Sequence, residues 1–128
     1  MWGWSRNTST APRPILKVII AAPTGVTLPL RLGASIAISR DGSKIAFPAS
    51  DSTGTAHLYV RYLDRVEPMM VAGSERAGAP FFSPDGLSIG FGQGSGIRTV
   101  ALAGGPLVSL CDWIGRGASW GDDGNIIF

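Results

Sequence analysis

Residues 83–91 read SPDGLSIGF, and nearly the same phrase occurs earlier, at residues 39–47, as SRDGSKIAF. A third copy begins at residue 121 and reads GDDGNIIF. The Asp-Gly pairs of the three copies start at positions 41, 85 and 123, which are intervals of 44 and 38 residues. Self-similarity at intervals of about 20–50 residues is typical of proteins built from stacked supersecondary units. The sequence therefore predicts an array of repeated units.

Each copy places an Asp-Gly turn between a short apolar strand and an alternating strand that ends on phenylalanine. Glycine accepts the positive φ angles of a tight hairpin, and the aspartate carboxylate can accept hydrogen bonds from backbone N–H groups of the turn. We therefore predict a structural turn role for six residues: Asp41, Gly42, Asp85, Gly86, Asp123 and Gly124. A catalytic site of paired carboxylates would need two of these aspartates in one cleft, whereas repeats place them on separate units.

Strand signals recur in the same order around each phrase. The first unit, residues 33–73, is expected to contain strands at 35–39, 44–49, 56–63 and 68–72. The second unit, residues 77–112, is expected to contain strands at 79–83, 88–92, 97–102 and 107–111, and residues 117–128 supply only the first hairpin of a third unit. Four antiparallel strands followed by a link are the content of one propeller blade. The predicted fold class is all-β, a partial β-propeller over residues 15–128 with about two blades and a third begun.

The stretch before the first unit divides into a linker and two extended segments. Residues 1–14 have no hydrophobic period and are rich in Ser, Thr and Pro, which predicts a flexible linker. Trp2, Trp4 and Arg6 are residue types that gather at a membrane boundary, so a juxtamembrane position with a membrane tether upstream of Met1 is an alternative. Residues 15–21 predict a strand, and residues 26–32 predict an edge strand or an irregular crossing because they contain a proline.

Alternation along the strands predicts which side chains are buried. We expect Phe47, Phe91 and Phe128 to occupy equivalent buried positions between blades, beside Ile45, Ile89 and Ile126. In residues 56–63, Leu58, Val60 and Tyr62 share one face, whereas His57, Tyr59 and Arg61 share the other, where we expect His57 to be exposed to solvent. Cys111 is the only cysteine and is expected to be a small core residue, because free cysteine is among the most buried residue types.

Composition argues against several classes of function. The net charge is +2 and the eleven basic residues are scattered, so no nucleic-acid partner is predicted. We find no cluster with metal-ligand spacing, and the glycines at 90–96 lie between two strands rather than before a helix, so no metal or cofactor is predicted. A catalytic triad would need His57, the only histidine, beside a serine and a carboxylate, and the G-x-S-x-G elbow is absent. We predict no catalytic residue in this chain.

The three phrases, extended to residues 38–47, 82–91 and 120–128, resemble the WD40-like repeat of TolB-type propellers, which is typically written S-P-D-G-x-x-I-A-F. The segments LAGGP (102–106) and PTGVTLPL (23–30) are similar, more narrowly, to propellers attached outside the membrane to bacterial serine/threonine kinases. Two departures stand out: Arg40 replaces the motif proline, and Gly121 and Asp122 replace Ser-Pro in the third copy. The kinase signatures are absent from this chain, so kinase activity is not carried over to it.

The resemblance implies a non-catalytic protein-interaction or sensor scaffold, periplasmic or extracytoplasmic, within a bacterial protein whose full-length form is expected to be an enzyme such as a kinase. The alternative is the propeller portion of a hydrolase or peptidase whose catalytic residues lie outside this chain. The sequence does not identify the protein or small ligand that would bind. Two and a third blades cannot close into a ring of about six to eight, so we expect further blades after Phe128. We also expect bare sheet faces and self-association of the chain on its own.

Overall fold

The structure is a computed structural model of the 128-residue chain, and it describes residues 15, 17–28, 36–112 and 117–128. The predicted linker at residues 1–14 lies outside the described residues, as does the part of the second extended segment from residue 29 onward.

In the described ranges, ten strands form three separate sheets. The first sheet contains, in spatial order, β1 (Ala37–Ile38), β2 (Lys44–Ser50), β3 (Ala56–Tyr62) and β4 (Met69–Met70). The second contains β5 (Gly78–Phe82), β6 (Ser88–Gln93), β7 (Gly96–Ala101) and β8 (Val108–Asp112), and the third pairs β9 (Ser119–Trp120) with β10 (Ile126–Ile127). All neighbouring strands are antiparallel, and the described residues contain no helix. The prediction of an all-β chain with antiparallel sheets is confirmed.

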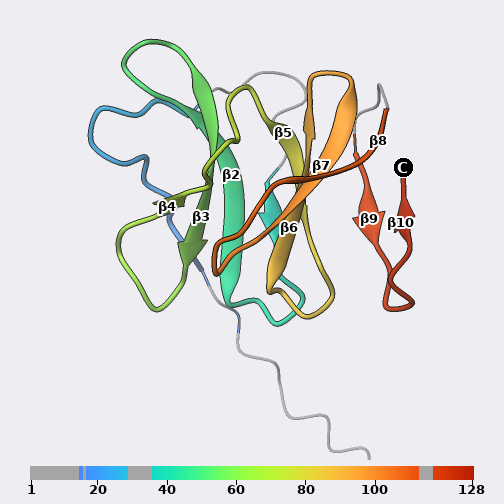
Figure 1. Cartoon of the computed structure of the whole chain (residues 1–128). Helices are drawn as coiled ribbons and strands as arrows, with labels where there is room; N and C mark the ends of the chain where they lie inside the picture. The colour runs from blue at the N-terminus through green and yellow to red at the C-terminus, as the bar shows by residue number, and fades with distance from the viewer. Residues whose placement is uncertain (1–14, 16, 29–35, 113–116) are drawn as a thin grey trace, which may run out of the picture.

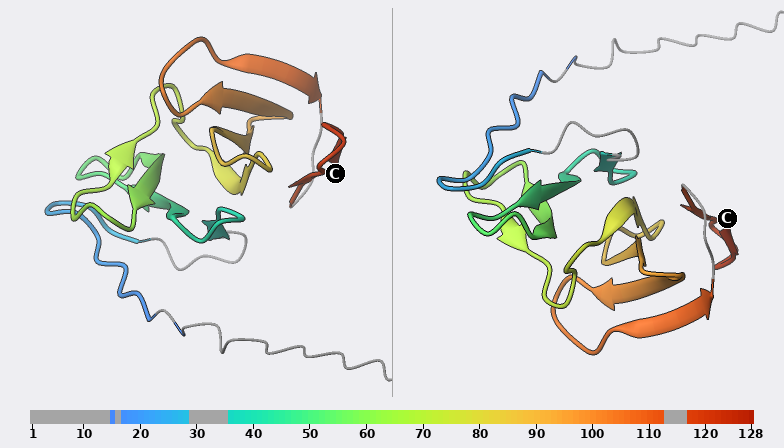
Figure 2. Two further views of the ribbon diagram at one scale, coloured as in Figure 1. Left: turned by 90° about the horizontal axis from the view of Figure 1, so that it is seen from below. Right: turned by 90° about the horizontal axis from the view of Figure 1, so that it is seen from above.

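The three sheets stand side by side in chain order (Figure 1). Seen from below and from above, the three sheets spread apart like the blades of a fan, and the first strand of each sheet lies on the side where the sheets come together (Figure 2). In agreement with these views, β1 is in contact with β5, and β5 is in contact with β9. The fan therefore brings together three strands that are about 40 residues apart in the sequence.

The first and second sheets share a hydrophobic core. The first sheet contributes Ala46, Leu58 and Val60, and the second contributes Phe82, Ile89, Phe91 and Val100, with Val71 and Ala77 from the connecting segment. Ile89 and Phe91 are fully buried. Leu58, Val60 and the partly buried Tyr62 lie on the same face of β3, as their alternation predicts. The Ile-x-Phe pair of the second phrase therefore faces the preceding sheet.

The opposite face of the first sheet carries a second core. Ile45, Phe47, Ala49 and Tyr59 are buried there, and Val18, Ile20, Val26 and Leu28 pack against them. Phe47 and Tyr59 stack with ring centroids 6.1 Å apart. The prediction that this face lies bare is therefore wrong, because the chain folds residues 18–28 back onto it. The prediction that Phe47 lies between two blades is wrong for the same reason, since Phe47 is buried between the first sheet and this segment.

The segment that covers this face is not the strand that its composition predicts. The described part of residues 15–21 forms no strand, and residues 17–28 meet the sheet through one isolated bridge between Thr27 and Ser50. The side chain of Arg61 adds a hydrogen bond of 2.8 Å from Nη1 to the carbonyl oxygen of Ile19. Val18 and Ile20 pack their side chains on the sheet although their backbone is not paired with a strand. A strand needs a partner that supplies consecutive backbone hydrogen bonds, and this segment has one isolated bridge.

Three predicted environments differ from the structure. Phe128 is 57% exposed, unlike Phe47 and Phe91, because the third sheet has only two strands among the described residues and its last residues lie at the margin of the fan. Cys111 is half-buried rather than a core residue, because β8 is the outermost strand of the second sheet. The side chain of His57 is only 14% exposed, because it bends back toward Asp51 in the adjoining turn.

Candidate ligand pocket at the first strands

The three Asp-Gly turns have the predicted geometry of turns closed by their own carboxylates. Asp41 Oδ1 accepts hydrogen bonds from the Ser39 hydroxyl at 2.6 Å and from the backbone N–H of Ser43 at 3.1 Å. Asp85 Oδ1 does the same with the Ser83 hydroxyl, at 2.5 Å, and the N–H of Leu87, at 2.9 Å.

The third turn lacks a hydroxyl at the equivalent position. Asp123 instead accepts from the backbone N–H of Asn125 at 3.1 Å and from its side-chain amide at 2.7 Å. All three turns have a glycine at positive φ: 72° at Gly42, 68° at Gly86 and 81° at Gly124. These values lie in the left-handed region that glycine adopts at little cost.

Hydrogen bonds to the carboxylates also shift their titration. The Ser39 hydroxyl, followed by the groups of Ser43, holds the pKa of Asp41 well below its usual value. The Ser83 hydroxyl and then the Leu87 amide lower the pKa of Asp85, and Asn125 lowers that of Asp123. The cause is the same in each turn, since donors that bond to the charged form stabilise it. These aspartates are therefore ionised acceptors occupied by their own turns.

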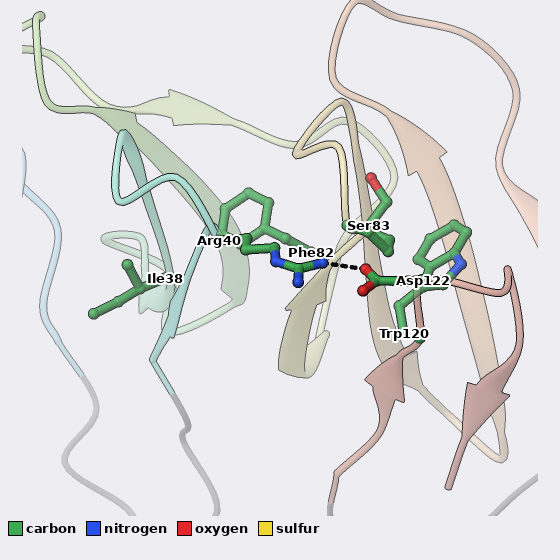
Figure 3. Close-up of a pocket in the computed structure, with 8 residues that line it drawn as sticks. Ile38, Arg40, Phe82, Ser83, Trp120 and Asp122 are labelled. Atoms are coloured by element: carbon green, nitrogen blue, oxygen red, sulfur yellow. Dashed lines mark hydrogen bonds and ion pairs between the residues drawn. The ribbon is translucent and has the colours of Figure 1, made fainter. Parts of the chain in front are cut away.

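A pocket of about 350 Å³ opens beside the turns, where the first strands of the three sheets converge. Its lining consists of equivalent positions of the repeated phrase: Ile38 and Arg40 from the first copy, Phe82, Ser83 and Pro84 from the second, and Trp120, Gly121 and Asp122 from the third. In Figure 3, Arg40 and Asp122 point toward one another, with Phe82, Ser83 and Trp120 close to them and Ile38 standing apart. The array therefore builds one cavity from three separated stretches of sequence.

The pocket joins an apolar part to a charged rim. Phe82 is 9% exposed, and the half-buried Trp120 meets Phe81 edge to face, with ring centroids 6.3 Å apart. Across the rim, the guanidinium of Arg40 forms an ion pair with the carboxylate of Asp122 (Figure 3). Their side chains are 69% and 67% exposed, respectively, so both charges remain accessible to solvent. Apolar surface beside a few placed polar groups is typical of small-ligand sites.

His57 and Asp51 form a second pair of oppositely chargeable side chains in contact. His57 Nε2 lies 3.3 Å from Asp51 Oδ2, while Nδ1 is buried and has no hydrogen-bond partner among the residues that the structure describes. The other oxygen of Asp51 accepts from Thr53 and Thr55 within its own turn. A catalytic triad needs a serine hydroxyl on the second ring nitrogen, and no hydroxyl of the described residues occupies that place.

Sequence reasoning identified the turn residues but missed the pocket beside them. The available signal was the pair of departures from the repeat, Arg40 and Asp122, which place opposite charges at equivalent positions of two copies. Within the described ranges, no group of three or more histidine, cysteine or acidic side chains could hold a metal ion. No helix in the described part of the chain is long and apolar enough to cross a membrane. No protein-family model matches the chain, and no curated protein is significantly similar to it in sequence.

Proposed function

We propose that this chain is a non-catalytic binding module, a portion of a larger WD40-like propeller of the TolB type. The observation that carries the proposal is the convergence of equivalent positions of three repeats on one pocket with an apolar floor and a charged rim. Repeat proteins bury the faces of their units against neighbours, so the edges of the units are left to bind other molecules. In this proposal the first strands provide the binding surface, and the turn aspartates hold it in place.

The proposal extends to the setting of the module. We place it outside the cytoplasm, in the position that such propellers occupy in bacterial membrane-bound serine/threonine kinases, where it would act as a sensor or interaction domain. This placement rests on the resemblance of the phrases and links alone. The coding sequence on either side tests it: a kinase domain followed by a membrane helix upstream is the expected result. A Ser-Asp-His hydrolase domain downstream would instead favour the propeller portion of a hydrolase.

Binding at the pocket can be tested directly by NMR of the tryptophan indole groups. The Trp120 signal is assigned by comparison with a Trp120→Phe variant, and a library of small molecules and short peptides is titrated into the labelled protein. We expect at least one compound to shift this signal saturably and to bind more weakly to an Arg40→Ala, Asp122→Ala double variant. Val66→Ala, at a residue that is 82% exposed and outside the pocket, is the control. If every shift were non-saturable or independent of the pocket variant, the proposal would be wrong.

A further inference from the structure

The two charged residues of the pocket are also the two departures from the repeated phrase. The second position of the phrase is Arg40 in the first copy, Pro84 in the second and Asp122 in the third. Proline is the motif residue at this position, so one copy has exchanged it for a cation and another for an anion. In the fold, these two exchanges meet across the rim of one pocket, although 82 residues separate them.

The stability of the turns does not explain this pair of exchanges. Each turn is closed by its own Asp-Gly residues, whose hydrogen bonds do not involve Arg40 or Asp122. Ion pairs between side chains as exposed as these contribute little to stability, because water screens the charges and the side chains lose freedom. A pair of opposite charges at the mouth of a cavity is better explained by what enters the cavity.

We propose that the pocket binds a zwitterionic ligand of the size of one amino acid or a dipeptide, and this proposal rests on the binding function proposed above. The ligand carboxylate lies against Arg40, the ligand ammonium lies against Asp122, and an apolar side chain lies against Phe82 and Trp120. Entry of the ligand replaces the single ion pair between the two rim residues with one ion pair at each of them.

Charge balance selects this class of ligand over simpler ones. A lone anion at Arg40 would be repelled by the neighbouring Asp122 carboxylate, and a lone cation at Asp122 would be repelled by Arg40. A zwitterion satisfies both, and the planar guanidinium suits a carboxylate because it can donate two parallel hydrogen bonds. The volume of about 350 Å³ lies near the lower end of the range for ligand pockets, about 300–1,000 Å³, which suits a small molecule.

The test compares three forms of one molecule in titrations that follow the Trp120 indole signal. L-phenylalanine carries both charges, N-acetyl-L-phenylalanine lacks the cation, and L-phenylalanine amide lacks the anion. We expect the zwitterion to bind about two- to fivefold more tightly than either blocked form, because each blocked form lacks one ion pair at an exposed side chain and leaves its remaining charge beside a like charge. Arg40→Gln should reduce affinity for the zwitterion, which loses the partner of its carboxylate, but should not weaken binding of the amide, because the variant removes the charge that repels a lone cation. Asp122→Asn should likewise reduce affinity for the zwitterion, which loses the partner of its ammonium, but should not weaken binding of N-acetyl-L-phenylalanine.

Controls separate the ligand class from the binding function itself. Arg65→Gln removes an exposed guanidinium that lies over Tyr62, away from the pocket, and should leave all three affinities unchanged. Equal binding of the three forms, or binding of uncharged library compounds in preference to all of them, would overturn the zwitterion proposal and leave the pocket function standing. If no compound of any class shifted the Trp120 signal saturably, both proposals would fall.

Discussion

At the scale of single residues, the turn carboxylates make the free energy of unfolding depend on pH. Hydrogen bonds within the turns lower the pKa values of Asp41, Asp85 and Asp123 in the folded chain. An aspartate in an unfolded chain titrates near 3.9. A carboxyl whose pKa is lower in the folded state than in the unfolded state stabilises the fold above about pH 4. That contribution is lost as the pH falls through the folded pKa.

Replacing Asp85 by asparagine should therefore reduce the loss of stability in acid. We expect Asp85→Asn to be less stable than the wild type at pH 7, because the hydroxyl of Ser83 and the N–H of Leu87 lose a charged acceptor. The difference should shrink as the pH falls below about 4 and approaches the lowered pKa of the folded wild-type carboxyl. Urea unfolding at a series of pH values measures both effects. Asp64→Asn, at an exposed turn residue, is the control, and a constant difference at all pH values would contradict the argument.

Phe91 tests the shared core at the same scale. Its ring is fully buried between the first and second sheets, and truncating a buried phenylalanine to alanine typically costs about 3–5 kcal/mol. We expect Phe91→Ala to lower the free energy of unfolding by this amount in urea titrations. Leu87→Ala is the control: the Leu87 side chain is 64% exposed, so this substitution should change the free energy of unfolding by no more than about 0.5 kcal/mol. Similar effects from the two variants would show that Phe91 does not hold the sheets together.

At the scale of elements, the ring of Phe81 on β5 lies so close to Gly90 of β6 that it leaves no room for a side chain there. A Cβ atom added at Gly90 would overlap the ring of Phe81 on β5, whereas one added at Gly92 would meet only the Gly78 carbonyl oxygen, at 3.7 Å. We expect Gly90→Ala to destabilise the chain by about 1–3 kcal/mol, as overpacking does, and Gly92→Ala to be tolerated. Thermal unfolding of the two variants gives the comparison. A Gly90 variant that melts with the wild type would mean that Phe81 moves aside without cost.

The strands could be predicted from the sequence more fully than the contacts between them. Alternation at 44–49 and 56–63 predicts which side chains share a face of the first sheet. The bounds predicted for the strands of the two four-stranded sheets lie within a few residues of those in the structure. The bulge in β5 was not predictable, because it depends on Ala79 adopting a φ of 48°, which alanine rarely does. The sequence marks Arg40 and Asp122 as departures from the repeat but does not show that they form one pocket, since they meet only after the three sheets have packed.

At the scale of the whole molecule, residues 17–28 act as a cover for the first sheet. The face of the second sheet that carries Ile89 and Phe91 packs on the first sheet. The equivalent face of the first sheet carries Ile45 and Phe47, and residues 18–28 pack on it. A segment packed in this way keeps the apolar face of the sheet from being exposed. The cover is attached by one bridge, one arginine hydrogen bond and a few apolar side chains, so it depends strongly on those side chains.

Alternating exposure along the cover provides a matched pair of variants. Val18 and Ile20 pack on the sheet, whereas Ile15 and Ile19 are 87% and 86% exposed. We expect a Val18→Asp, Ile20→Asp double variant to release the cover, because burying two carboxylates against Phe47 and Tyr59 is costly. The uncovered apolar face should then increase self-association, measured by sedimentation at low micromolar concentration, and should bind a hydrophobic dye. Ile15→Asp, Ile19→Asp adds the same charge to the same segment and should sediment as the wild type does. If the two double variants sedimented alike, the cover would contribute nothing to keeping the first sheet from associating.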